Sequence, residues 1–71
     1  MQVNAEQDQL INLNTATIEE LQQLPYIGEV RAKYITEYRS KQRIEGIEQL
    51  KEINSIGEGV VSTIEDKVKL E

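Results

Sequence analysis

The chain has 71 residues, no cysteine, no histidine and a formal net charge of −5. A chain of this length holds one domain at most, and it lacks a disulfide framework, a thiolate metal site and the commonest proton shuttle. Its aromatic residues are three tyrosines, so the core must come from Ile, Leu, Val and Ala. No apolar run approaches the roughly 20 residues that span a bilayer, so no membrane contact is expected from this stretch.

Charge is distributed unevenly along the chain. Between residues 31 and 43, five basic residues stand against the single acidic residue Glu37, a local net charge of +4. The basic residues are Arg31, Lys33, Arg39, Lys41 and Arg43. A basic segment in an acidic chain is typical either of a solvated helix face or of a surface for an acidic partner such as nucleic acid.

The two ends of the chain differ from its middle. The first nine residues, MQVNAEQDQ, are polar and aperiodic, and they predict a disordered lead-in or linker at residues 1–9. The folded domain is expected over residues 10–69. The final pair, residues 70–71, is interpreted as a remnant that a cloning step could leave.

The first half of the folded part predicts two helices. Thr17 and Glu20 match the capping-box pattern and open a first helix, which Pro25 is expected to stop. A second helix is expected from about Glu29 to Ser40. Its apolar side chains form one row, Val30, Tyr34 and Tyr38, with Ala32 and Ile35 beside it.

The second half predicts a connector and two more helices. Residues 41–46 are polar and form the connector, in which Ile44 alone is expected to point inward. A third helix is expected around residues 47–53, and a fourth over about residues 59–67, because apolar residues recur there at helical spacing. No strand is predicted.

An internal repeat appears when the chain is compared with itself at an offset of 29 residues. Residues 18–35 align with residues 47–64, and seven of these eighteen pairs are identical. They are Ile18/Ile47, Glu19/Glu48, Leu21/Leu50, Ile27/Ile56, Gly28/Gly57, Glu29/Glu58 and Ile35/Ile64. The repeat predicts an all-α fold of two helical units, about residues 17–40 and 46–68, packed about a pseudo-twofold axis with a short connector between them.

Each unit has the tripeptide Ile-Gly-Glu where its two helices meet. Glycine tolerates a positive φ, so Gly28 and Gly57 are expected to reverse the chain. The first N–H groups of the next helix lack intrahelical partners and lie at the positive end of the helix dipole, which suits a phosphate. The structural alternative is an ordinary αα-hairpin turn whose amides are satisfied by water.

The run INLNTATIEELQQLPYIGEVRAKYITEYR, with the second unit ending in SIGEGVVSTI, resembles the ComEA-type helix-hairpin-helix domain of bacterial competence receptors for DNA uptake. The resemblance covers about residues 11–69. It rests on the opening Asn12-Leu13-Asn14-Thr15-Ala16, the Glu20-Leu21 pair, the Leu-Pro-x-Ile-Gly tip and the Ala32-x-x-Ile35 spacing. It implies binding of duplex DNA without sequence preference, in a bacterial parent protein that is membrane-anchored and extracytoplasmic.

The resemblance also implies which residues contact DNA, because hairpin amides and nearby basic side chains hold phosphates in that family. The expected contacts are Tyr26, Ile27, Gly28, Val30, Arg31 and Lys33 in the first hairpin, and Ser55, Gly57 and Gly59 in the second. The first hairpin is expected to dominate, because no cation follows Gly57 until Lys67. No cofactor is expected; the resemblance allows a monovalent cation at the hairpin carbonyls, which no side chain here requires.

This chain departs from the family pattern at two positions. The family has a glycine two residues before Gly28 and Gly57, where this chain has Tyr26 and Ser55. A side chain there would crowd an approaching phosphate. For Tyr26 three roles stay open: stacking on a sugar or base, anchoring another protein, or supporting the turn as a partly buried ring.

Two functions from different classes follow from these patterns. The first is sequence-independent DNA binding through phosphates. The alternative is a protein-interaction or assembly module, which the net acidity and the residues Tyr26 and Ser55 favour. An enzyme is not expected, because acidic neighbours such as Glu65 and Asp66 point about 100° apart on a helix and no nucleophile has a recognisable base partner.

Overall fold

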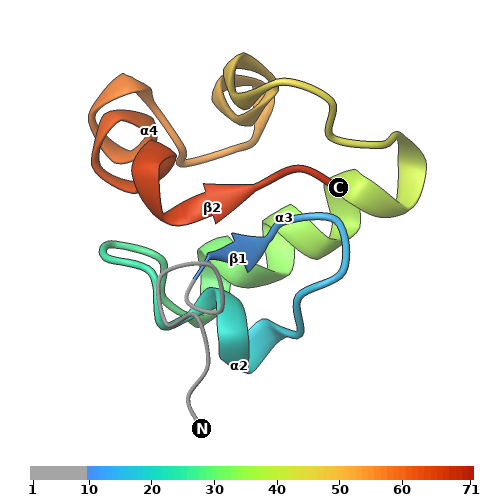
Figure 1. Ribbon diagram of the computed structural model, residues 1–71, viewed down its shortest axis with the longest axis horizontal. Coiled ribbons are helices and arrows are strands. Elements are labelled where there is room, and N and C mark those ends of the chain that lie inside the picture. The colour runs from blue at the N-terminus through green and yellow to red at the C-terminus, as the bar shows by residue number, and fades with distance from the viewer. Residues whose placement is uncertain (1–9) are drawn as a thin grey trace, which may run out of the picture.

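The computed structural model describes residues 10–71, so the lead-in expected at residues 1–9 lies outside the described part. In chain order the elements are β1 (Ile11–Asn12), α2 (Ile18–Leu21), α3 (Glu29–Lys41), the 3-10 helix η1 (Ile47–Glu52), α4 (Glu58–Ile64), the 3-10 helix η2 (Glu65–Lys67) and β2 (Val68–Lys69). Figure 1 shows α2 and α3 on one side of the short strand pair, with η1 and α4 on the other. The predicted all-helical class is confirmed.

Helix α2 begins with the predicted capping box. The Thr17 hydroxyl accepts a hydrogen bond from the Glu20 N–H at 3.1 Å, and the Thr17 N–H donates to Glu20 Oε1 at 2.8 Å. The helix ends at Leu21, well before Pro25. The following N–H group of Leu24 bonds to the Leu21 carbonyl three residues back, so the chain tightens into turns before the proline is reached.

Helix α3 runs over the span that the sequence predicts, one residue longer at its end. It buries Ala32 and Ile35, while Tyr34 and Tyr38 are half-buried and pack against the core. Val30 differs from the expected apolar row, because 60% of its surface is exposed. The row therefore faces the core only from its second member onward.

The second unit is helical but more tightly wound than predicted. The third expected helix is the 3-10 helix η1, and its start is held by the Gln49 side chain, whose Oε1 accepts from the N–H groups of Glu45 at 2.7 Å and Gly46 at 3.0 Å. The fourth expected helix is divided into α4 and η2. Short 3-10 segments of this kind are frequent at helix ends.

The core is built from thirteen buried apolar side chains, five from each unit and three from the segment before the first unit and the connector. They are Leu13, Ala16, Leu21, Leu24, Ile27, Ala32, Ile35, Ile44, Leu50, Ile53, Ile56, Val61 and Ile64. Ile44 is buried as predicted. No polar or charged side chain is buried within residues 10–71. The two units thus share one core, and their pseudo-twofold relation stays a prediction.

Strand β1, near the start of the described chain, lies against β2 near its end. Strand β1 pairs in parallel with β2, with Ile11 opposite Val68 and Asn12 opposite Lys69. This pairing was not expected from the sequence, because strands of two residues have no readable alternation. Leu70 also packs against the core, and the Glu71 N–H lies 3.3 Å from Asn12 Oδ1, so both terminal residues contact the fold.

Asn14 holds the connector between the two units. Its Nδ2 donates to the Ile44 carbonyl at 2.9 Å, and its Oδ1 accepts from the Ile44 N–H at 2.9 Å. Both backbone groups of a fully buried residue therefore depend on one side chain. A second polar contact, from Arg39 Nη1 to the Leu13 carbonyl at 2.9 Å, fastens the same segment to α3.

We expect Asn14→Ala to lower the free energy of unfolding by about 2 kcal/mol or more, because it leaves two buried backbone groups without partners. Urea denaturation followed by circular dichroism measures the change. Asn54→Ala is the matched control, since Asn54 is exposed and its loss should cost about 0.5 kcal/mol or less. Equal effects of the two substitutions would contradict the role assigned to Asn14.

Candidate nucleic-acid interface

The two hairpin turns have the same backbone conformation. We call residues 25–28 the first turn and residues 54–57 the second turn. Tyr26 and Ser55 have φ values of 67° and 70°, whereas no glycine has a positive φ among residues 10–71. The expectation that Gly28 and Gly57 reverse the chain is therefore wrong: the reversal occurs two residues earlier in each turn.

Each turn is anchored by the isoleucine that follows its left-handed residue. Ile27 and Ile56 are 2% and 3% exposed, and their N–H groups donate to the carbonyls of Leu24 and Ile53, both at 3.1 Å. Ile27 was expected among the DNA contacts. Because its side chain belongs to the core, only its backbone is left to meet a ligand.

The glycines at the turns have no role that the fold itself requires. Gly28 and Gly57 have φ values of −88° and −108° with extended ψ, which other residues adopt readily. A Cβ atom added at Gly28, Gly57 or Gly59 would meet no atom within 4 Å. Gly59 is the second residue of α4, and glycine is a weaker helix former than alanine.

What these glycines provide is access to the backbone. Gly28 and Gly57 are the N-cap residues of α3 and α4, and with no side chain they accept no capping hydrogen bond from the first N–H groups of these helices. The first N–H groups of a helix have no intrahelical acceptor. Bare glycines beside such groups allow an outside acceptor to come close, which side chains would hinder.

Arg31 joins the two turns. Its Nε donates to the Ser55 carbonyl at 2.7 Å, and its Nη1 donates to the Tyr26 carbonyl at 3.1 Å. The sequence predicts Arg31 as a DNA contact of the first hairpin, and the repeat has Val60 at the equivalent place. The structure adds a contact that the sequence does not signal, because the guanidinium bonds to both turns, which lie on the same side of the molecule (Figure 1).

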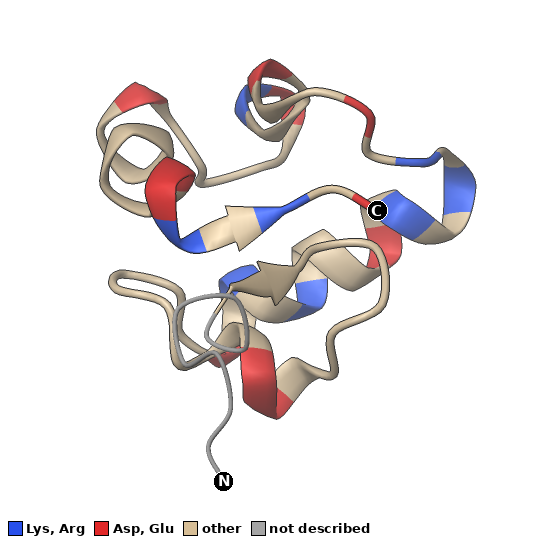
Figure 2. Ribbon diagram, viewed as in Figure 1, with Lys and Arg blue, Asp and Glu red and all other residues tan. Residues whose placement is uncertain are grey.

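The other charges near the turns are exposed and largely balanced. Lys33 forms an ion pair with Glu29 at 3.7 Å, and both side chains are more than half exposed. Glu58 lies in the first turn of α4. Figure 2 shows basic residues along α3 and the connector, with acidic residues on α2 and α4. The basic segment thus extends over α3 and into the connector, and within it Arg39 Nη1 donates to the Leu13 carbonyl.

Tyr26, in the first turn, and Val30, near the start of α3, are exposed apolar residues. Their exposed fractions are 68% and 60%, and they are the two large apolar residues that the described structure leaves exposed. Of the three roles weighed for Tyr26, support of the turn by a partly buried ring is therefore contradicted. Stacking on a nucleotide and anchoring a protein both require exposure of this kind.

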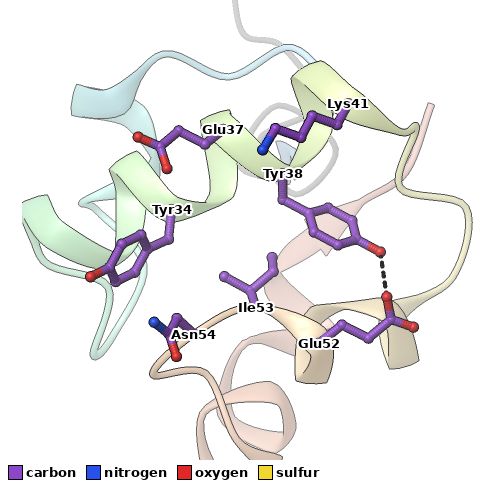
Figure 3. A pocket seen from close by; sticks show the side chains of 7 residues that line it. All are labelled: Tyr34, Glu37, Tyr38, Lys41, Glu52, Ile53 and Asn54. Carbon is purple, nitrogen blue, oxygen red and sulfur yellow. Dashed lines mark hydrogen bonds between the residues drawn. The ribbon is translucent and has the colours of Figure 1, made fainter.

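A shallow pocket lies between α3 and the segment that follows η1 (Figure 3). Its lining residues are Tyr34, Glu37, Tyr38, Lys41, Glu52, Ile53 and Asn54. The Tyr38 hydroxyl donates to Glu52 Oε1 at 2.9 Å and accepts from Gln42 Nε2 at 2.7 Å. The bond to Glu52 joins α3 to η1. We therefore attribute the pocket to the way the two units pack and not to a ligand site.

Within residues 10–71, no three or more Asp or Glu side chains are grouped so that they could hold a metal ion. In the same part of the chain, no helix is both long enough and apolar enough to cross a bilayer.

Comparison with known proteins agrees with the geometry of the turns. A family model described as the helix-hairpin-helix motif matches residues 6–69. The chain belongs to the helix-hairpin-helix family. It is 37% identical over 60 residues to ComE operon protein 1 of Bacillus subtilis (strain 168), across 83% of this chain and 29% of that protein. The chain thus spans less than a third of that relative's length, and the match supports the ComEA-type domain that its motifs predict.

The left-handed residues of this helix-hairpin-helix domain generate a stability prediction. We expect Tyr26→Gly and Ser55→Gly each to raise the free energy of unfolding by about 1 kcal/mol, because glycine adopts a positive φ without a steric penalty. Tyr26 is mostly exposed, so its removal forfeits little packing. Thermal and urea denaturation measure the change.

The control for these two substitutions is Gln22→Gly. Gln22 is also exposed and follows a short helix, but its φ is −68°, so glycine there only adds freedom to the unfolded chain and should destabilise slightly. If Tyr26→Gly lowers the free energy of unfolding as much as Gln22→Gly does, the left-handed turn carries no strain.

Proposed function

We propose that the two turns bind DNA through its phosphates, without reading base sequence. The observation that carries this proposal is the set of bare glycines, Gly28, Gly57 and Gly59, which neither backbone conformation nor packing requires. Membership of the helix-hairpin-helix family supports it. Hydrogen bonds to phosphates position a protein on DNA and carry no sequence information directly.

The proposed contacts divide into backbone and side-chain groups. The N–H groups around Gly28 and Val30 would donate to one phosphate, and those around Gly57 and Gly59 to another. Lys33 adds charge beside the first turn. Arg31 keeps unbonded N–H groups on a guanidinium that has five donors in all, so it can contact phosphate while it bonds to both turns.

Duplex DNA is the proposed form of the ligand, and uptake of DNA by a bacterium is the proposed setting. Both follow from the match to ComE operon protein 1 and from the ComEA-type motifs. In the parent protein we place the domain outside the cytoplasmic membrane. Both proposals concern a whole protein, whereas this chain is similar to only one part of ComE operon protein 1.

The second candidate function is a protein-interaction module, and one observation favours it. Tyr26 and Val30, four residues apart at and after the first turn, expose 68% and 60% of their surfaces. Exposed aromatic side chains are frequent anchors at protein interfaces. The DNA proposal explains the bare glycines, which the interaction module does not, and we therefore rank it first.

DNA binding by this domain should weaken steeply with salt. If three or four phosphates are neutralised, log K should fall against log salt concentration with a slope of roughly −3, and Kd should be micromolar or weaker at physiological salt. Titration of labelled duplexes at several salt concentrations measures both quantities. Two duplexes of equal length and different sequence should bind alike; a strong sequence preference would exclude a contact made through phosphates alone.

Reversing one charge near the turns should matter more than reversing one elsewhere. Lys33→Glu is expected to lower affinity about tenfold and to reduce the salt slope by about 1. Lys67→Glu is the matched control, because both lysines have acidic partners, at 3.7 Å and 3.4 Å, and both are substantially exposed. Both variants change the net charge equally.

Two other results would exclude this account. Equal losses for the two lysine variants would indicate diffuse attraction without a defined site. If wild type shows no salt-dependent binding to DNA, the interaction module becomes the better explanation, and Tyr26→Ala is then the first variant to test against a candidate protein partner.

A further inference from the structure

The guanidinium of Arg31 meets two equivalent atoms of the internal repeat. It donates from Nε to the Ser55 carbonyl at 2.7 Å and from Nη1 to the Tyr26 carbonyl at 3.1 Å. These carbonyls belong to the two residues with positive φ. The fixed, planar fork of an arginine side chain suits such a double contact, because its donors keep their relative directions.

This contact is the directional link between the two turns. Among residues 10–71, no other hydrogen bond or ion pair connects residues 25–31 with residues 54–60. The other polar contacts between the units involve η1 and not the second turn, as in the hydrogen bond from the Tyr38 hydroxyl to Glu52 Oε1 at 2.9 Å. Near the turns themselves the units otherwise share apolar burial, through core residues such as Ile27 and Ile56, and apolar burial is non-directional.

We infer that Arg31 is a positioning residue that fixes the two turns as one binding surface, an inference that rests on the proposed binding of DNA. With the link intact, the two turns keep a fixed relative orientation before DNA binds, so binding costs little additional conformational entropy. With the link broken, each turn contacts DNA independently. The preorganised pair therefore binds more tightly than two unlinked turns with the same charges.

The arginine-to-lysine substitution separates this role from that of charge. Arg31→Lys keeps the positive charge but replaces a planar fork with a single flexible ammonium group. Arg43→Lys is the matched control. Arg43 is an exposed arginine of the connector, and its side chain contacts neither the Tyr26 carbonyl nor the Ser55 carbonyl. Each variant is compared with wild type under conditions where circular dichroism shows it fully folded.

In the free protein, Arg31→Lys should shift the amide resonances of Ser55, Ile56 and Gly57, which lie far from residue 31 in sequence. In DNA titrations it should lower affinity about tenfold while leaving the salt slope unchanged. Arg43→Lys should change neither quantity. Wild-type affinity for Arg31→Lys, or unmoved resonances in the second turn, would overturn the inference.

A double-mutant cycle tests whether the turns act together. Gly57→Val places a side chain in the open space beside the second turn and should weaken DNA binding. If Arg31 couples the turns, this loss should be about threefold or more smaller when Arg31→Lys is already present. Additive losses would mean that the turns bind independently, and would overturn the inference even though DNA binding itself is retained.

The same experiments distinguish the inference from the proposed function. If wild type shows no salt-dependent binding to DNA, the proposed function fails and with it the role of Arg31 in DNA binding. The link between the turns is then decided by the amide resonances alone: a shift in the second turn supports it, and no shift overturns it.

Discussion

Burial of one apolar core by two small helical units is the constraint on which this domain depends. The chain has no cysteine for a disulfide and no histidine for a metal site, so the stabilisation must come from the thirteen buried apolar side chains of the two units and the segments that join them. Residues 11–14 complete this arrangement, since β1 pairs with β2 and Asn14 binds the connector at Ile44. The core also sets the turns, because each turn places one isoleucine inside the molecule and leaves its neighbours at the surface.

The turns show a distribution of residue types that stability alone does not explain. Tyrosine and serine occupy the positions with positive φ, where glycine would be less strained. Glycine instead occupies Gly28 and Gly57, whose conformations do not need it. Strain of this kind persists where the surrounding structure enforces it, and it is concentrated at functional sites. The exposed side chain of Tyr26 and the bare backbone beyond it are consistent with a surface adapted to a partner.

Local patterns in the sequence predicted the local structure, whereas contacts between units were not predicted. The Thr17–Glu20 capping box, helix α3 and the buried Ile44 follow from spacing along a single segment. The bridge from Arg31 to Ser55 joins two units, and nothing in the repeat signals it, because its partners are carbonyl groups that every residue has. The assignment of the chain reversal to Gly28 and Gly57 was wrong because glycine tolerates a positive φ without requiring one, and in this chain Tyr26 and Ser55 have it. The expected DNA contacts remain predictions.

The charges near the turns decide how an acidic domain could hold an anion. At physiological ionic strength, screening limits interactions between exposed charges to about 8 Å, so the total of −5 matters less than the groups at the turns. There, Arg31 and Lys33 are offset by Glu29 and Glu58, and the local formal charge is zero. The proposed phosphate binding at these turns therefore combines the charges of Arg31 and Lys33 with the direction of backbone N–H groups and of the Arg31 donors. Because such hydrogen bonds act only at short range, the relative placement of the two turns, which we infer that Arg31 sets, contributes to binding together with the cations.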